Sequence, residues 1–290
     1  MELEKNRHMD NQKRITIVNM KGGVGKTTLA VNMAFVLTKY HNKKVLLVDV
    51  DPQFNATQYL INQQDILKHF QNKKTIYDVL MPKKEEEINL SGKLSAKKDV
   101  IKLKDFIINV VNNESSRLDL LPSSLKLINF ETTKRGVENH LKNFINSKCK
   151  EYDYIIFDCP PTLSILTLSA YLASTHYLIP IKPDYLSSLG LPLLERGLKE
   201  YEDTYEHSLI PIGVVFTMSL NTSSLPEEIE SSINRSGSRK IFTNRISQTV
   251  NIARSIENNI ETIKVFYNNG KFARYASEFK EVVNEMIKVL

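Results

Sequence analysis

The pattern of hydrophobic and polar positions along the chain alternates between short apolar runs and longer amphipathic segments. The apolar runs predict strands at residues 15–19, 45–48, 118–122, 154–157, 177–181 and 210–216. Apolar residues spaced as on one helix face predict helices at 29–40, 125–130, 136–147, 187–205 and 271–290. Short apolar runs suit buried parallel strands, and helix-length segments suit the crossovers between them. We therefore predict an α/β fold, a mostly parallel twisted sheet with helices on both faces.

One stretch interrupts this alternation, because the apolar residues in 54–117 follow neither the spacing of a helix nor that of a strand. It contains the charged run at 83–87 and further lysines up to Lys104. We expect a surface insertion around residues 81–104, with helical character, whose lysines contact DNA or a partner or simply face solvent. The length of 290 residues suits one α/β domain. Residues 14–290 are predicted to form that domain, and the polar residues 1–13 a frayed tail.

The most informative motif directly follows the first predicted strand. The segment Met20-Lys21-Gly22-Gly23-Val24-Gly25-Lys26-Thr27-Thr28 leads from that strand into the predicted helix at 29–40. A glycine loop in this context presents backbone N–H groups and a helix N-terminus to phosphates. Lys26 is placed to reach the β- and γ-phosphates, and the Thr27 hydroxyl to complete the shell of a bound Mg²⁺. We expect a P-loop NTPase whose nucleotide contacts are Lys21, Gly22, Gly23, Val24, Gly25, Lys26, Thr27 and Thr28.

Two acidic motifs end predicted strands. Asp49 and Asp51 follow the apolar run at 45–48, and Asp158 follows the run at 154–157. Open α/β sheets place their chemistry at the carboxyl ends of the strands, so these carboxylates are expected beside the glycine loop. An aspartate that ends a buried strand is suited to hold Mg²⁺, which makes Asp158 and Thr27 the predicted metal ligands. The alternative for each aspartate alone is an ordinary strand-end cap.

The glycine loop departs from the usual G-x-x-x-x-G-K-[ST] pattern, because Met20 replaces a glycine and Lys21 is an additional lysine. KGGVGKTT resembles the deviant P-loop of the ParA/MinD family of dimerising ATPases, and DVDPQ-x-N-A-T and DYIIFDCPPTL resemble its second and third motifs. The resemblance implies ATP and Mg²⁺ as cofactors and a homodimer around two nucleotides, with Lys21 acting in trans. It also implies that Lys21, Lys26 and Asp51 are catalytic, with Asp51 orienting the attacking water.

DVDPQ-x-N-A-T and DCPPTL match the ParA branch best. That branch implies an ATPase of plasmid or chromosome segregation whose ATP-bound dimer binds DNA without sequence preference. A ParB-type centromere-binding partner would stimulate hydrolysis and so release the DNA. Only a short segment precedes the first predicted strand, so the chain resembles the short form without an N-terminal helix-turn-helix domain. Its expected location is the cytoplasm, in association with the nucleoid.

The charge distribution is compatible with a nucleic-acid partner. The net charge is +6, and residues 235–290 contain ten basic and five acidic residues. Phosphate contacts release counterions whatever the base sequence, although a modest basic excess also serves solubility alone. Lys271 and Arg274 would share one face at the start of the last predicted helix. The predicted DNA contacts are Arg245, Arg254, Lys271 and Arg274.

Two other functions stay open. A MinD-like membrane-positioning ATPase would insert its last helix into lipid, but the polar face of residues 279–290 is mixed in charge, so we do not expect membrane binding. A small-molecule ligase on the same fold, such as a dethiobiotin-synthetase-like enzyme, is disfavoured by DVDPQ-x-N-A-T. Cys149 and Cys159 are too few for a disulfide framework and are predicted to pack in the interior.

Overall fold

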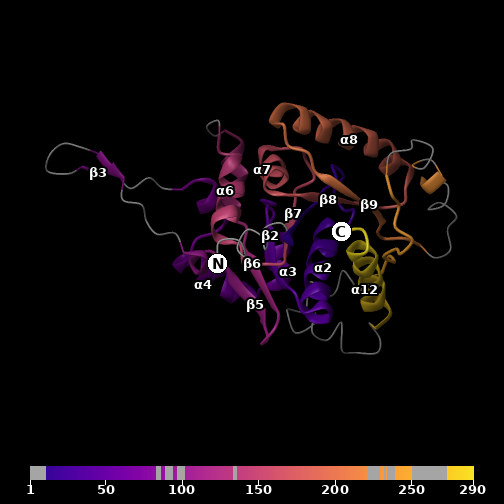
Figure 1. The fold of residues 1–290 in the computed structure, drawn as a ribbon, viewed down its shortest axis with the longest axis horizontal. Helices are drawn as coiled ribbons and strands as arrows, with labels where there is room; N and C mark the ends of the chain where they lie inside the picture. The colour runs from indigo at the N-terminus through magenta and orange to yellow at the C-terminus, as the bar shows by residue number, and fades with distance from the viewer. Residues whose placement is uncertain are drawn as a thin grey trace.

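A computed structural model describes residues 11–82, 86–88, 94–96, 102–132, 136–220, 229–231, 233, 239–249 and 273–290. Seven strands form one sheet in the order β5-β6-β2-β7-β1-β8-β9 (Figure 1). The strands are β1 (Lys13–Ile17), β2 (Lys44–Asp49), β5 (Ile108–Asn112), β6 (Arg117–Leu121), β7 (Tyr154–Asp158), β8 (His176–Ile181) and β9 (Ile210–Phe216). All pairings are parallel except that of β5 with β6 at one edge. The predicted sheet is confirmed, and all six predicted strands are present.

Helices cover both faces of this sheet (Figure 1). They are α2 (Lys26–His41), α3 (Asn55–Leu60), α4 (Gln63–Asn72), α5 (Ile76–Leu80), α6 (Asn139–Lys148), α7 (Ile165–Ala173), α8 (Tyr185–Tyr205) and α12 (Ala273–Ile287). Successive residues of a strand point to opposite faces. Accordingly, Val45 and Leu47 join a core formed with α2 and α12, whereas Leu46 and Val48 join a second core formed with α6 and α7. A strand covered on both sides is apolar throughout, which is why the run at 45–48 is continuous.

The unpatterned stretch at 54–117 folds into α3, α4, α5 and the edge strand β5, none of which the pattern predicted. Within the insertion, the described residues form two short antiparallel strands, β3 (Glu86–Ile88) and β4 (Leu94–Ala96), and a 3₁₀ turn at Leu103–Asp105. The expectation of a helical insertion was therefore wrong for these residues. The sequence between the strands contains Asn89, Ser91 and Gly92, residue types that favour a turn over a helix. In Figure 1, β3 lies away from the main sheet.

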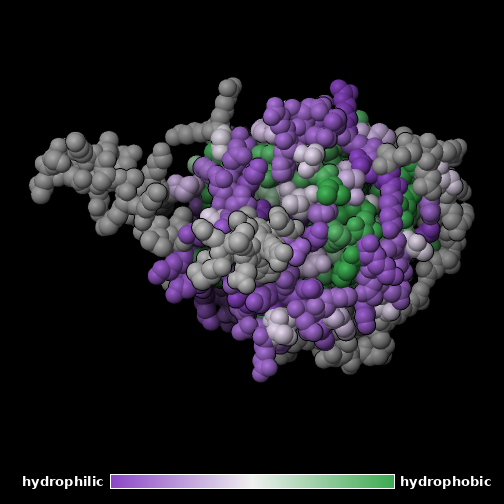
Figure 2. All heavy atoms as spheres, in the orientation of Figure 1, coloured by the Kyte–Doolittle hydropathy of each residue, from purple (hydrophilic) through white to green (hydrophobic). Residues whose placement is uncertain are grey.

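The last helix, α12, packs its apolar face against the protein. Phe279, Val282, Val283 and Met286 are fully or almost fully buried in the core that contains α2. Hydrophilic side chains cover the outer side of α12, and hydrophobic ones gather between α12 and α8 (Figure 2). The apolar face of α12 is thus not available for insertion into lipid. Among the described residues, no helix has the length and apolar character needed to cross a membrane.

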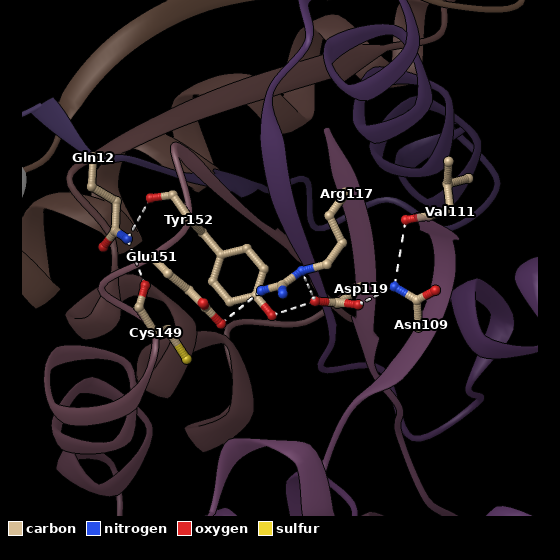
Figure 3. A network of polar contacts seen from close by, with 8 residues as sticks. All are labelled: Gln12, Asn109, Val111, Arg117, Asp119, Cys149, Glu151 and Tyr152. Atoms are coloured by element: carbon tan, nitrogen blue, oxygen red, sulfur yellow. Dashed lines mark hydrogen bonds and ion pairs between the residues drawn. The ribbon is translucent and has the colours of Figure 1, made fainter. Parts of the chain in front are cut away.

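A polar network joins β5 and β6 to the segments that precede β1 and β7 (Figure 3). The carboxylate of Asp119 accepts hydrogen bonds from the Tyr152 hydroxyl at 2.6 Å and from the Asn109 amide at 2.8 Å, and it pairs with Arg117 at 2.6 Å. Gln12 is already part of the fold, because its amide donates to the carbonyls of Cys149 and Tyr152. Residues 1–10 of the predicted tail lie outside the described residues.

Candidate nucleotide-binding site

The glycine loop connects β1 to α2, as the sequence predicts. Gly25 has φ 79° and ψ 23°, in the left-handed region, where glycine avoids the strain that a side chain would add. Helix α2 starts at Lys26, and no side chain caps its N-terminus. The first N–H groups of a helix lack intrahelical partners and carry partial positive charge. This uncapped end is therefore suited to bind an anion such as phosphate.

Side chains just after β1 and β9 hold the loop in place. Asn19 donates to the Pro180 carbonyl at 2.8 Å, and its side-chain oxygen accepts from the Lys21 N–H at 2.9 Å. Thr217, just after β9, donates its hydroxyl proton to the Val24 carbonyl at 2.7 Å. Sequence reasoning missed Thr217, since no local motif marks it and only the fold brings it to the loop.

The two lysines of the loop have different surroundings. Lys26 is buried, and its ammonium donates to the Lys21 carbonyl at 3.0 Å. Burial lowers the pKa of Lys26, and the nearby Asp158 carboxylate opposes that shift. The Lys21 ammonium instead lies 2.7 Å from the Asp184 carboxylate, with both side chains about one-third exposed. In this arrangement the Lys21 side chain pairs with a residue of its own subunit, whereas Lys26 is the lysine expected to contact the phosphates.

Asp158, the last residue of β7, is the strongest candidate for a metal ligand. Both of its carboxylate oxygens are buried without a hydrogen-bond partner. Burial raises the pKa of Asp158 to about 7, while the nearby Thr27 hydroxyl and the Lys26 ammonium oppose the rise. A buried carboxylate with unfilled oxygens favours a cation beside it. The residues thus fit Mg²⁺, which commonly takes one or two protein ligands and completes its shell with phosphates and water.

Asp49 pairs with Asp158 across the parallel strands β2 and β7, but its oxygens are already engaged. Its Oδ2 accepts hydrogen bonds from the Thr57 N–H at 2.8 Å and from the Thr57 hydroxyl at 2.7 Å, and its Oδ1 accepts from the Asp51 N–H at 3.3 Å. Burial raises the pKa of Asp49 well above its usual value, and the Asp158 carboxylate adds to that rise. Asp49 therefore anchors α3, and Asp158 is the carboxylate left for a metal.

Asp51 lies beyond the end of β2 and is 6% exposed. Its carboxylate accepts from the Gln53 N–H at 2.9 Å, and its carbonyl accepts from the Ser123 hydroxyl at 2.6 Å. Ser123 lies two residues after the end of β6, so the segments that follow two neighbouring strands fix the backbone of Asp51. Asp51 and Asp158, which the sequence predicts to lie beside the glycine loop, are both close enough to Lys26 to oppose the lowering of its pKa by burial.

Of the predicted DNA contacts, only Arg245 has a described side chain. Its guanidinium pairs with Glu230 at 2.8 Å and lies 5.3 Å from the centre of the Phe216 ring. These contacts connect the segment at 239–249 to the fold, so Arg245 already has intramolecular partners. Arg254 and Lys271 lie outside the described residues, as does the side chain of Arg274.

Neither cysteine is available as a metal ligand. Cys149 and Cys159 are free thiols and are buried, which confirms the prediction that they pack in the interior. Burial raises the pKa of Cys149 to about 12. Within the described residues, no group of three or more His, Cys, Asp or Glu side chains is arranged to hold a metal ion. A metal at Asp158 would therefore complete its shell with ligands of other kinds, such as the Thr27 hydroxyl, phosphate oxygens and water.

Comparison with known proteins gives concordant matches. A family model described as an AAA domain matches residues 12–210. The chain is 33% identical over 244 residues to the sporulation initiation inhibitor protein Soj of Bacillus subtilis, which covers 82% of this chain and 83% of Soj. It is 28% identical to the virulence plasmid ParA family protein pGP5-D of Chlamydia psittaci, over 94% of this chain and 95% of that protein. A putative plasmid partition protein from Borrelia burgdorferi bound to AMPPNP superposes with a TM-score of 0.73 at 27% identity, covering 96% of this chain and 100% of that one.

Proposed function

This chain belongs to the ParA family of partition ATPases, and we propose that it binds ATP and Mg²⁺, dimerises in the ATP state and holds DNA until hydrolysis releases it. The family assignment makes the chain an ATPase of the partition type. One observation supports the nucleotide site above all: an uncapped helix N-terminus at Gly25 adjoins a buried carboxylate, Asp158, with no hydrogen-bond partner. The helix N-terminus is suited to bind an anion such as phosphate, and the carboxylate is suited to bind a cation such as Mg²⁺.

The proposed roles follow from the surroundings of each side chain. Lys26 and the loop amides bind the phosphates, and Thr27 with Asp158 would hold Mg²⁺, which neutralises the developing charge on the phosphoryl oxygens. Asp51 orients the attacking water, because its backbone is fixed from two strands while its carboxylate lies beside Lys26. Phosphoryl transfer needs little beyond such positioning and charge neutralisation.

Dimerisation is proposed because the loop has room for a second subunit. A Cβ atom built on Gly22 meets nothing within 4 Å, and Gly22 and Gly23 are exposed. In the dimer, Lys21 would leave Asp184 and contact the nucleotide of the partner subunit. A ParB-type protein is proposed to stimulate hydrolysis, and the DNA-bound dimer is proposed to associate with the nucleoid.

The first test is the binding of a random-sequence DNA duplex to the purified protein with ATP, with ADP and without nucleotide, at about 50 and 200 mM salt. Tight binding in ATP alone, strongly weakened at the higher salt, is expected. The Lys26→Ala variant serves as the control, because it should lose nucleotide binding and with it the ATP-dependent DNA binding. Equal DNA binding in all three nucleotide states would contradict the proposed switch, and no binding in any state would contradict the DNA partner while leaving the ATPase intact.

A further inference from the structure

Thr217 contacts the nucleotide loop from a distant part of the chain. Its hydroxyl donates to the Val24 carbonyl at 2.7 Å across a sequence separation of 193 residues. The residue is 3% exposed, so this hydrogen bond is shielded from water. A buried hydrogen bond of this kind restricts the carbonyl to one direction, because the alternative is an unsatisfied polar group.

The direction of that carbonyl determines the direction of the next N–H. The Val24 C=O and the Gly25 N–H belong to one planar trans peptide, in which they point in opposite directions. Because the carbonyl points at Thr217, the Gly25 N–H points away from it. Within the described residues, the Gly25 N–H donates to no protein acceptor. It is therefore left for a ligand at the start of α2.

Thr217 itself is held rigidly. Its own N–H donates to the Ile181 carbonyl at 2.9 Å, which continues the pairing of β8 with β9. Its side chain also packs toward the loop, since a Cβ built on Gly25 would lie 3.7 Å from the Thr217 Cβ. The next residue, Met218, has φ 53°, a conformation that is costly without glycine and that persists only where the surroundings enforce it.

We propose that Thr217 is a positioning residue for ATP. Its hydroxyl fixes the Val24–Gly25 peptide so that the Gly25 N–H is aimed at a phosphate before the nucleotide arrives. Such preorganisation improves binding because the loop does not have to be ordered by the ligand. The proposal rests on the ATP binding proposed above. It predicts that loss of the Thr217 hydroxyl lowers the affinity for ATP and leaves the rate of the chemical step almost unchanged.

The test compares ATP affinity and steady-state kinetics of Thr217→Val, which removes the hydroxyl at nearly constant shape, with those of Thr217→Ser, which keeps it. We expect Thr217→Val to weaken ATP binding roughly fivefold, the effect of one ordinary hydrogen bond, with kcat almost unchanged. Thr217→Ser should bind nearly as well as the wild type. Thr38→Val is the matched control, because the buried Thr38 hydroxyl also donates to a backbone carbonyl, that of Ala34, at 2.9 Å and outside the loop.

If Thr217→Val folds and binds ATP like the wild type, or if Thr38→Val weakens binding equally, the proposal is wrong. Should Thr217→Val fail to fold, Thr217→Ser and Thr217→Ala provide the same comparison, since both lack the methyl group and differ only in the hydroxyl. Equal affinity of that pair would also overturn the proposal. A wild-type protein that does not bind ATP would instead contradict the proposed function, which keeps the two failures distinct.

Discussion

At the residue scale, some residues of the glycine loop are held by hydrogen bonds within the subunit, whereas others face open space. Asn19 and Thr217 fix the loop from neighbouring strands, and Lys26 donates back to the loop itself. Gly22 differs from these positions, because the space around it is empty and it has no left-handed φ that would demand glycine. Nothing in a single subunit therefore requires glycine at this position.

Gly22→Val tests the proposed dimer contact. The added side chain meets open space in the monomer, so we expect nearly unchanged thermal stability and ATP binding. At an interface formed around the loop, the same side chain would clash and prevent dimerisation. Sedimentation of the variant with a non-hydrolysable ATP analogue measures this, and a normal ATP-dependent dimer would contradict the proposed contact.

Asp184→Asn tests the partner of Lys21 in the free subunit. The ion pair is about one-third exposed, so its contribution is limited to about 1 kcal/mol in each subunit. Because both pairs would break in a dimer, their loss should favour ATP-dependent dimerisation by roughly 30-fold at most. The double variant Lys21→Ala/Asp184→Asn separates direct from indirect effects. If Asp184→Asn has the same effect without Lys21, the ion pair is not the cause.

At the scale of elements, the network on Asp119 joins β5, β6 and the segment before β7 at the edge of the sheet opposite the nucleotide site. Asp119 is 1% exposed and depends on its hydrogen bonds for stability in the interior. The bond from the Tyr152 hydroxyl, at 2.6 Å, is charge-assisted and therefore stronger than a bond between neutral groups.

Tyr152→Phe should lower the free energy of unfolding by roughly 2 kcal/mol, because a buried carboxylate loses one of its donors. Tyr171→Phe is the matched control, since the buried Tyr171 hydroxyl donates to a neutral acceptor, the His207 carbonyl, at 2.8 Å. We expect about half the loss for that variant. Urea unfolding measures both, and equal losses would show that the charge of Asp119 adds nothing.

The sequence predicted the elements that carry strong periodicity and missed those that do not. Continuous apolar runs marked the six parallel strands because both of their faces are covered. Strand β5 (Ile108–Asn112) lies at the edge of the sheet, where Asn109 and Asn112 are exposed and its other residues only half-buried, so its hydrophobic pattern is weak. The start of helix α4 is indicated in the sequence by Asn62, a residue type favoured at helix N-caps. In the structure its side-chain oxygen accepts a hydrogen bond from the Asp65 N–H at 2.9 Å.

The nucleotide site was predictable where its residues are local in sequence. The loop and the aspartates lie in short motifs, and their strand context indicated that they would meet. Thr217 and Asp184 carry no such signature, because their roles arise only when β8 is placed beside β1 and β9 beside β8. Long-range contacts of this kind depend on strand order, which a single sequence does not specify.

At the scale of the whole molecule, buried histidines make the fold sensitive to acid. Burial lowers the pKa of His176 to about 4, and the charge of Lys13 adds to the shift. Burial also lowers the pKa values of His69 and His207. In the unfolded chain these histidines bind protons at a pKa near 6.5, so between pH 6.5 and 4 they hold more protons in the unfolded than in the folded chain. The histidines therefore contribute a loss of folding stability as the pH decreases through this range, whereas the raised pKa values of Asp49 and Asp158 contribute in the opposite direction.

His176 alone should account for a loss of up to roughly 3 kcal/mol between pH 7 and pH 4. Urea unfolding of the wild type and of His176→Asn at pH 7.5 and pH 5 tests this assignment. The variant should lose less stability on acidification than the wild type. An identical loss in both proteins would assign the acid sensitivity to other groups.

The complete burial of both cysteines has a practical consequence for following this protein in solution. At neutral pH, the inaccessible and protonated thiols of Cys149 and Cys159 should not react with maleimide dyes. A single cysteine introduced on the exposed surface would then carry a fluorophore at one known position without removal of the native ones. Energy transfer between two such labelled subunits would report their approach and separation in real time through one ATP cycle.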